Sequence, residues 1–217
     1  MRGMTPLSKV KESLESLTAK SIFGPIIDIS FTSTIRMFHN LVFLNVQVHC
    51  HGSEGRCTFK LNNDNVAELA MALRRLRSLL LGRACPDNTC ATTVACLLPI
   101  SVYCLDLREL EIHFNTTNIV EDFKNISEDP RLQELRSLPK STLICLDVWK
   151  TPLLNESRSL ETVVDGMFDI FPSLQSCNGF KGSCDALNEK IAESGRRCVS
   201  PDTREQADDG KDNGWWY

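Results

Sequence analysis

Apolar residues recur along the chain in a six-residue motif. A leucine is followed by two variable residues, an apolar residue, one variable residue and a second apolar residue. Copies occupy residues 41–46, 76–81, 107–112 and 143–148, and a degenerate fifth copy begins at Leu174. Their first leucines lie 35, 31, 36 and 31 residues apart. The period of two at the end of each copy predicts a β-strand that turns alternate side chains to one face.

The stretches between the copies have helical periodicity instead, with apolar residues three and four positions apart. The residues that carry it are Val66, Leu69, Ala70 and Leu73, then Val94, Leu97, Leu98 and Val102, then Ile119, Phe123 and Ile126, and last Leu160, Val163, Val164, Met167 and Phe171. Asn65 with Glu68 fits a capping box for the first of these helices. Pro99 stands either in the first turn of the second helix or at a kink, and Pro172 ends the last.

Both ends of the chain predict further elements. Residues 6–20 fit an amphipathic helix, with Thr5 as its cap and Pro6 at its first position. Residues 26–31 fit the strand template, only 15 residues before Leu41. Residues 184–193 suggest a last helix that covers the open end of the core. The expected organisation is an N-terminal helix (1–22), a repeat domain (23–194) and a polar, disordered tail (195–217).

One strand and one helix cannot bury their own apolar faces, so such units gain stability by stacking. Stacking would join the strands into a curved parallel sheet with the leucines as a continuous spine. We therefore expect an α/β fold, an irregular leucine-rich-repeat-like solenoid with short parallel strands on the concave side and helices on the convex side. The alternative is a non-repeating α/β domain. Ankyrin and tetratricopeptide repeats have a similar period but lack the β alternation.

Composition excludes several classes of protein. The net charge of −4 and the pI of about 5.6 argue against a nucleic-acid-binding surface. No apolar run approaches the roughly 18 residues of a membrane helix, and no apolar segment near Met1 indicates a secretory signal. We expect a cytoplasmic or nuclear protein. Because such compartments are reducing, we expect its ten cysteines to be reduced thiols, and several of them stand at apolar positions. These are Cys96, Cys104, Cys145 and Cys177.

Several segments together resemble a fungal F-box/leucine-rich-repeat-like family. They are RCTF at 56–59, LAMAL at 69–73, LLLG at 79–82, CLLPISV at 96–102, LEIHFNTT at 110–117 and DIFPSL at 169–174. The resemblance covers roughly residues 35–180. It implies a repeat domain that selects a target protein, which in full F-box proteins an N-terminal F-box delivers to a ubiquitin ligase through a Skp-type adaptor. Residues 1–40 carry no F-box pattern, so we expect a Skp-type adaptor as partner only if an F-box is encoded upstream.

The variable positions of the strand motif supply candidate protein-binding residues, because they would face the concave side of a solenoid. They are Phe43, Asn45, Gln47, Arg77, Arg108, Glu109, Glu111, His113, Asp147 and Trp149. Charged residues mixed with aromatic ones suit protein recognition, in which Arg and Trp are frequent anchors. The alternative is that each of these side chains is only solvated.

No motif in the sequence indicates catalysis or a bound cofactor. HExxH, GxSxG, phosphate-binding glycine loops and dinucleotide fingerprints are missing. His49, Cys50, His51 and Cys57 cluster, but their spacing is not that of a zinc site. The sequence therefore predicts a non-enzymatic protein-interaction module, with no metal and no cofactor. The alternatives are a stand-alone structural or decoy repeat protein without a ligase link, and an enzyme whose site assembles only in three dimensions.

Overall fold

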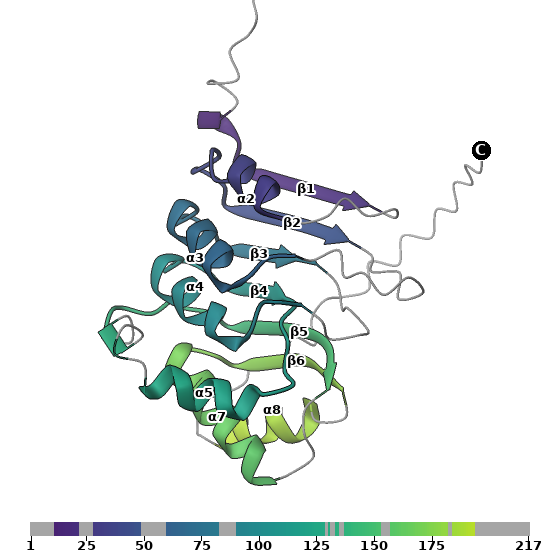
Figure 1. The fold of residues 1–217 in the computed structure, drawn as a ribbon, viewed down its shortest axis with the longest axis vertical. Helices are drawn as coiled ribbons and strands as arrows, with labels where there is room; N and C mark the ends of the chain where they lie inside the picture. Colours follow the sequence, from purple (N-terminus) through teal and green to yellow (C-terminus); the bar gives the residue numbers. More distant parts are fainter. Residues whose placement is uncertain are drawn as a thin grey trace, which may run out of the picture.

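The computed structural model describes residues 11–21, 28–48, 60–82, 90–128, 130, 133–134, 137–152, 157–181 and 184–193. Within them, six parallel strands form one sheet in which each strand lies beside its successor in the chain (Figure 1). The strands are β1 (Ser16–Ser21), β2 (Phe43–Val48), β3 (Ser78–Leu81), β4 (Glu109–Ile112), β5 (Cys145–Pro152) and β6 (Ser176–Lys181).

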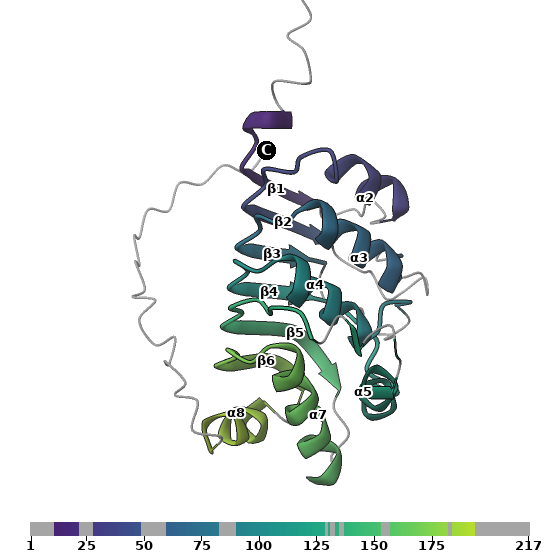
Figure 2. The same ribbon diagram turned by 90° about the vertical axis from the view of Figure 1, so that its left-hand side faces the viewer.

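Helices alternate with these strands. They are α2 (Ile29–Ile35), α3 (Asn63–Ala72), a 3₁₀ turn η1 (Val94–Cys96), α4 (Leu97–Tyr103), α5 (Ile119–Glu128), α7 (Ser157–Ile170) and α8 (Cys184–Glu193). The helices between strands lie on one side of the sheet (Figure 2). This follows from the strand order, because parallel crossovers are nearly always right-handed and the sheet grows in one direction. The predicted α/β fold, with a parallel sheet of alternating strands and helices, is confirmed.

Rows of apolar side chains from the strand motif form the core between the sheet and these helices. The register pairs Leu44 with Leu79, Leu79 with Leu110, and Leu110 with Leu146, which brings equivalent motif positions side by side. The buried rows are Leu41, Leu76, Leu107, Leu143 and Leu174, then Leu44, Leu79, Leu110, Leu146 and Cys177, and last Val46, Leu81, Ile112 and Val148. The predicted burial of the motif positions is thus confirmed.

The same backbone hydrogen bonds recur where each strand begins. The N–H groups of Arg77 and Ser78 both donate to the carbonyl oxygen of Val42, at 2.8 and 3.2 Å. In the same way, Val42 and Phe43 donate to Glu15, Arg108 and Glu109 to Arg77, Ile144 and Cys145 to Arg108, and Gln175 and Ser176 to Ile144. All five junctions between neighbouring strands are therefore built alike, although the intervening sequences differ.

The first strand of the sheet lies where a helix was predicted. Only residues 11–13 of the expected helix over 6–20 are helical in the described part, and β1 follows them. Leu17 pairs with Leu44 and Ala19 with Val46, so Leu14, Leu17 and Ala19 form a further copy of the strand motif. The helix prediction is wrong here because pairing with β2 outweighs the local helical pattern.

The strand predicted for residues 26–31 is wrong as well. α2 begins at Ile29, with Asp28 as its N-cap. The Asp28 carboxylate accepts hydrogen bonds from the backbone N–H groups of Ser30 and Phe31, at 2.9 and 3.2 Å. Such a cap satisfies donors that are otherwise unpaired in the first turn, so it favours a helix. Residues 22–27 lie outside the described part.

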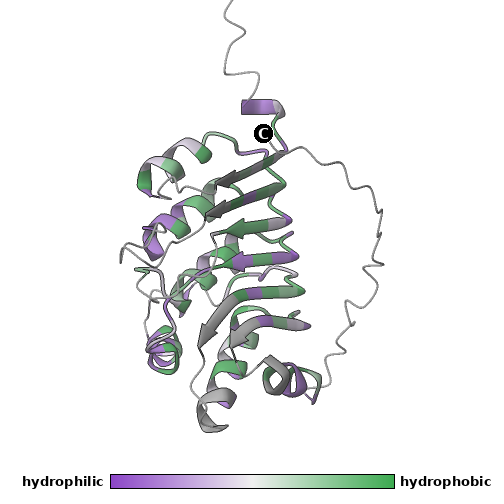
Figure 3. Ribbon diagram, turned by 90° about the vertical axis from the view of Figure 1, so that its right-hand side faces the viewer, coloured by the Kyte–Doolittle hydropathy of each residue, from purple (hydrophilic) through white to green (hydrophobic). Residues whose placement is uncertain are grey.

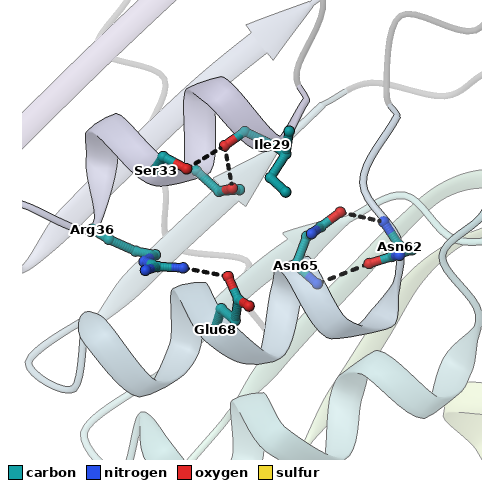
Figure 4. Close-up of polar contacts among 7 residues, drawn as sticks. Ile29, Ser33, Arg36, Asn62, Asn65 and Glu68 are labelled. Atoms are coloured by element: carbon teal, nitrogen blue, oxygen red, sulfur yellow. Dashed lines mark hydrogen bonds and ion pairs between the residues drawn. The ribbon is translucent and has the colours of Figure 1, made fainter.

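α3 lies beside α2, and an ion pair between Arg36 and Glu68 joins the two helices at the surface (Figure 4). The capping box of α3 is formed by Asn62 and Asn65: the Asn65 N–H donates to Asn62 Oδ1 at 2.9 Å, and the Asn62 N–H donates to Asn65 Oδ1 at 3.2 Å. The predicted box of Asn65 with Glu68 is therefore wrong, because the helix begins about one turn earlier than expected.

Three other helices agree with the sequence pattern. Pro99 stands in the first turn of α4, where its missing N–H costs no hydrogen bond. α7 ends at Ile170, just before Pro172. α8 packs on β6 through buried Leu187 and Ile191, and it covers the end of the core as predicted.

The contact between α5 and α7 depends on a glycine, which leads to a stability prediction. A Cβ atom added at Gly166 would lie 2.3 Å from Cδ1 of the buried Phe123 ring. We expect Gly166→Ala to destabilise the fold by about 1–3 kcal/mol through overpacking, despite the better helix propensity of alanine. Urea unfolding measures this, with exposed Asp165→Ala as the control. A stabilised Gly166→Ala variant would contradict the packing.

The remaining predictions concern the cysteines, the C-terminal tail and the possibility of a membrane helix. Among the described cysteines, Cys90, Cys96, Cys104 and Cys177 are buried, and Cys145 is half-buried. Burial raises the pKa of the Cys104 thiol to about 12. The cluster of His49, Cys50, His51 and Cys57 and the tail 195–217 lie outside the described residues. Among the helices that are described, none has the length and apolar character needed to cross a membrane.

Candidate functional site

The candidate site is the open face of the sheet, meaning the side opposite the helices between strands (Figure 3). Its side chains alternate with the buried leucines along each strand. The register defines two rows across it. The first row is Ser16, Phe43, Ser78, Glu109, Cys145 and Ser176, and the second is Thr18, Asn45, Leu80, Glu111, Asp147 and Asn178.

The two rows bring several predicted residues together. In the second row Asn45, Glu111 and Asp147 lie on nearby strands, with Leu80 between Asn45 and Glu111. Adjacent strands are about 4.8 Å apart, so neighbouring side chains in a row can contact one ligand. In the first row the Ser78 hydroxyl donates to the Glu109 carboxylate at 3.2 Å. The face is therefore polar and rich in carboxylates over β4 and β5.

A further row, the entry row, runs along the edge of the open face where the strands begin. It contains the residue after the leading leucine of each copy, and its members are Glu15, Val42, Arg77, Arg108, Ile144 and Gln175. Arg77 and Arg108 are exposed neighbours, and the Arg108 N–H donates to the Arg77 carbonyl at 2.9 Å. The two predicted arginines thus stand side by side at the rim.

Two predicted residues are not accessible, contrary to expectation. Asn45 is only 9% exposed and His113 only 3%. Within the described part, Asn45 Oδ1 and both ring nitrogens of His113 have no hydrogen-bond partner. Burial lowers the pKa of His113 to about 4, so its imidazole is neutral at pH 7. Alternation predicts the face on which a side chain lies but not how deeply its neighbours cover it.

The last two predicted residues are placed by their backbone only. Gln47 belongs to β2, where its register partner is Lys20, and Trp149 belongs to β5. Their side chains lie outside the described part of the structure. The binding role predicted for Gln47 and Trp149 therefore stays a prediction.

Sequence reasoning missed several members of the rows, among them Ser78, Leu80, Cys145 and Asn178. Leu80 was hidden inside a run of three leucines, although it holds the same motif position as Asn45, Glu111 and Asp147. Aligning the motif copies on their first leucine would have found it. Across the described residues, no three His, Cys, Asp or Glu side chains are grouped so as to hold a metal ion.

Comparison with known proteins gives no assignment. No protein-family model matches the sequence. No curated protein matches it at a significant level. The open face of the sheet is therefore the basis for a functional proposal.

Proposed function

We propose that the chain is a protein-interaction module, a leucine-rich-repeat-like solenoid whose open face is the concave binding surface. The observation that carries the proposal is the five-fold recurrence of the strand-entry hydrogen bonds, in which Arg77 and Ser78 share the Val42 carbonyl and each later strand repeats the pattern. Aligned registers and stacked rows of buried leucines support it. Solenoids of this kind use their extended concave surface for binding.

The chemistry of the open face supports binding rather than structural packing alone. Its described side chains mix exposed arginine and glutamate with the half-buried Phe43 and the 37% exposed Ile144. Arginine and aromatic residues with apolar neighbours are typical of protein interfaces. The helices between strands leave this face uncovered (Figure 3). A purely structural repeat protein would not require such a surface.

The resemblance to the F-box/leucine-rich-repeat-like family narrows this proposal. In its narrower form, the module selects targets for an F-box-type ubiquitin ligase and cooperates with a Skp-type adaptor. The five motif copies from Leu41 onward, which lie within the resemblance, would then be the part of the chain that selects the target. The adaptor contact would require an F-box, for which residues 1–40 carry no pattern.

Site-specific photo-crosslinking in cells tests the proposal. A benzoylphenylalanine in place of Glu109, exposed on the open face, should crosslink a specific partner, whereas one in place of Lys124, exposed on α5, should not. Titration of that purified partner should then give a defined Kd. Equal crosslinking from both positions, or none from position 109, would contradict the proposed surface. A Skp-type adaptor in the complex would support the narrower form, and its absence would contradict it.

A further inference from the structure

We infer that Arg77 and Arg108 form a docking pair for an acidic segment of a partner protein, an inference that rests on the proposed binding function. The two residues hold the same position in consecutive motif copies, and their backbones are joined by the hydrogen bond from the Arg108 N–H to the Arg77 carbonyl. Both side chains carry a positive charge, and like charges held near each other repel. An anionic ligand bound between them would relieve this repulsion.

The other arginines whose side chains are described all have a partner inside the molecule. Arg36 pairs with Glu68, Arg74 lies 5.8 Å from the centre of the Tyr103 ring, and Arg75 donates to Asn40 Oδ1 at 3.0 Å. For Arg77 and Arg108 no ion pair or side-chain hydrogen bond is found among the described residues. Among the arginines with described side chains, only Arg77 and Arg108 at the rim of the open face thus have guanidinium donors without a partner.

Nearby carboxylates do not neutralise the pair. Asp106 and Glu109 flank Arg108 in sequence, yet neither comes within 4 Å of either guanidinium in the described structure. The Glu109 carboxylate accepts a hydrogen bond from Ser78 instead. A guanidinium presents a planar fork of donors that fits a carboxylate, so a carboxylate from outside is the matching ligand.

Apolar side chains border the pair. Ile144 is 37% exposed, and its N–H donates to the Arg108 carbonyl at 3.0 Å, so it stands next to Arg108 in the entry row. Leu105 is 43% exposed, and its carbonyl accepts from the Thr142 N–H, so it lies close to the same strand entry. The matching segment therefore carries an aliphatic residue beside its Asp or Glu residues.

A basic segment fits the open face less well. It would have to bind the carboxylates of Glu111 and Asp147, but both residues already interact within the molecule. The exposed Glu15, just before β1, also belongs to the entry row, but Val42 separates it from Arg77. Over β3 and β4, the described charges of the face that make no contact within the molecule are those of Arg77 and Arg108. This charge complementarity favours an acidic segment of a partner protein. The experiment below also tests two other occupants, a phosphorylated segment and a second copy of the chain.

Selection from a displayed peptide library tests the inference. The wild-type protein should enrich peptides with several Asp or Glu residues beside an aliphatic residue. The variant R77E/R108E should weaken the binding of the best such peptide about tenfold or more, and raising the salt concentration should weaken it for the wild type. The control K60E/K124E makes the same charge change at exposed sites elsewhere and should keep wild-type affinity. All of these positions are exposed, so circular dichroism should show both variants folded.

Several outcomes would overturn the docking pair. These are enrichment of basic or uncharged peptides, equal affinity of R77E/R108E for the acidic peptide, and binding only when its acidic residues are replaced by phosphoserine. A wild-type dimer that R77E/R108E dissociates would likewise assign the pair to a second copy. Crosslinking from position 109 distinguishes the failure of the docking pair from the failure of the proposed binding function. If a partner crosslinks but the protein does not prefer acidic peptides, only the docking pair is refuted. If nothing crosslinks, the binding function is refuted as well.

Discussion

Replacing Leu110 by alanine should destabilise the fold by about 2–5 kcal/mol, the range for buried leucines in well-packed cores. Leu110 is 2% exposed and stands in the middle of its row, with Leu79 and Leu146 as register partners on either side. The alanine leaves a cavity that two neighbouring strand–helix units share. Since each unit contacts mainly its neighbours, the loss weakens both interfaces. Urea unfolding followed by circular dichroism measures the change in free energy.

A matched control comes from the same motif position at the edge of the sheet. Leu17 corresponds to Leu110, but it is only half-buried in the edge strand β1. Leu17→Ala removes the same atoms and should cost clearly less, because less apolar surface returns to water. Equal losses in the two variants, or a negligible loss in Leu110→Ala, would show that the row of leucines is not the core of the fold.

The sequence was sufficient to predict the strands in the interior of the sheet. Leu76, Leu107 and Leu143 each begin a copy, and each is fully buried, because these strands are covered by helices and packed between two others. Such positions leave a strong apolar pattern. This is why the order of strands and helices from β2 to α8 could be predicted from periodicity alone.

The edge strand β1 could not be predicted in the same way. Leu14 and Leu17 are only partly buried, and the copy that they begin has alanine at its last apolar position. A half-buried edge strand needs fewer apolar residues, so its pattern is weak and was mistaken for part of a helix. In the next segment, the Asp28 cap favours a helix over the apolar alternation of residues 26–31.

For the candidate site, periodicity predicted the face of the sheet on which a side chain lies, but not how deeply that side chain is buried. It placed Glu111 and Asp147 on one face correctly, because alternation follows from strand geometry. The burial of His113 depends on how the surrounding chain covers it, which no local pattern contains. The sequence spacing suggested that Arg77 and Arg108 are neighbours. Only the structure shows that, among the arginines with described side chains, the other three have internal partners while these two do not.

Acidification from pH 6.5 to pH 4 should destabilise the protein through His113. Burial lowers the pKa of His113 from 6.5 to about 4 in the folded chain. Above pH 6.5 the imidazole is neutral in both states, so it contributes no pH dependence. Below pH 6.5 the unfolded chain binds a proton that the folded chain does not, so stability falls with pH. At 1.36 kcal/mol for each unit of pKa difference, the loss reaches about 3 kcal/mol near pH 4 and grows little below it.

The variant His113→Met isolates this effect from the carboxylates that titrate in the same range. It fills a similar volume without an ionisable group and removes two buried nitrogens that lack hydrogen-bond partners in the described part. Urea unfolding at several pH values should show a shallower loss of stability for His113→Met than for the wild type between pH 6.5 and 4. The control His39→Gln, exposed in the turn after α2, should keep the wild-type profile. Parallel profiles for wild type and His113→Met would mean that His113 takes up a proton in the folded chain as readily as in the unfolded one, and thus that its imidazole is reached by water.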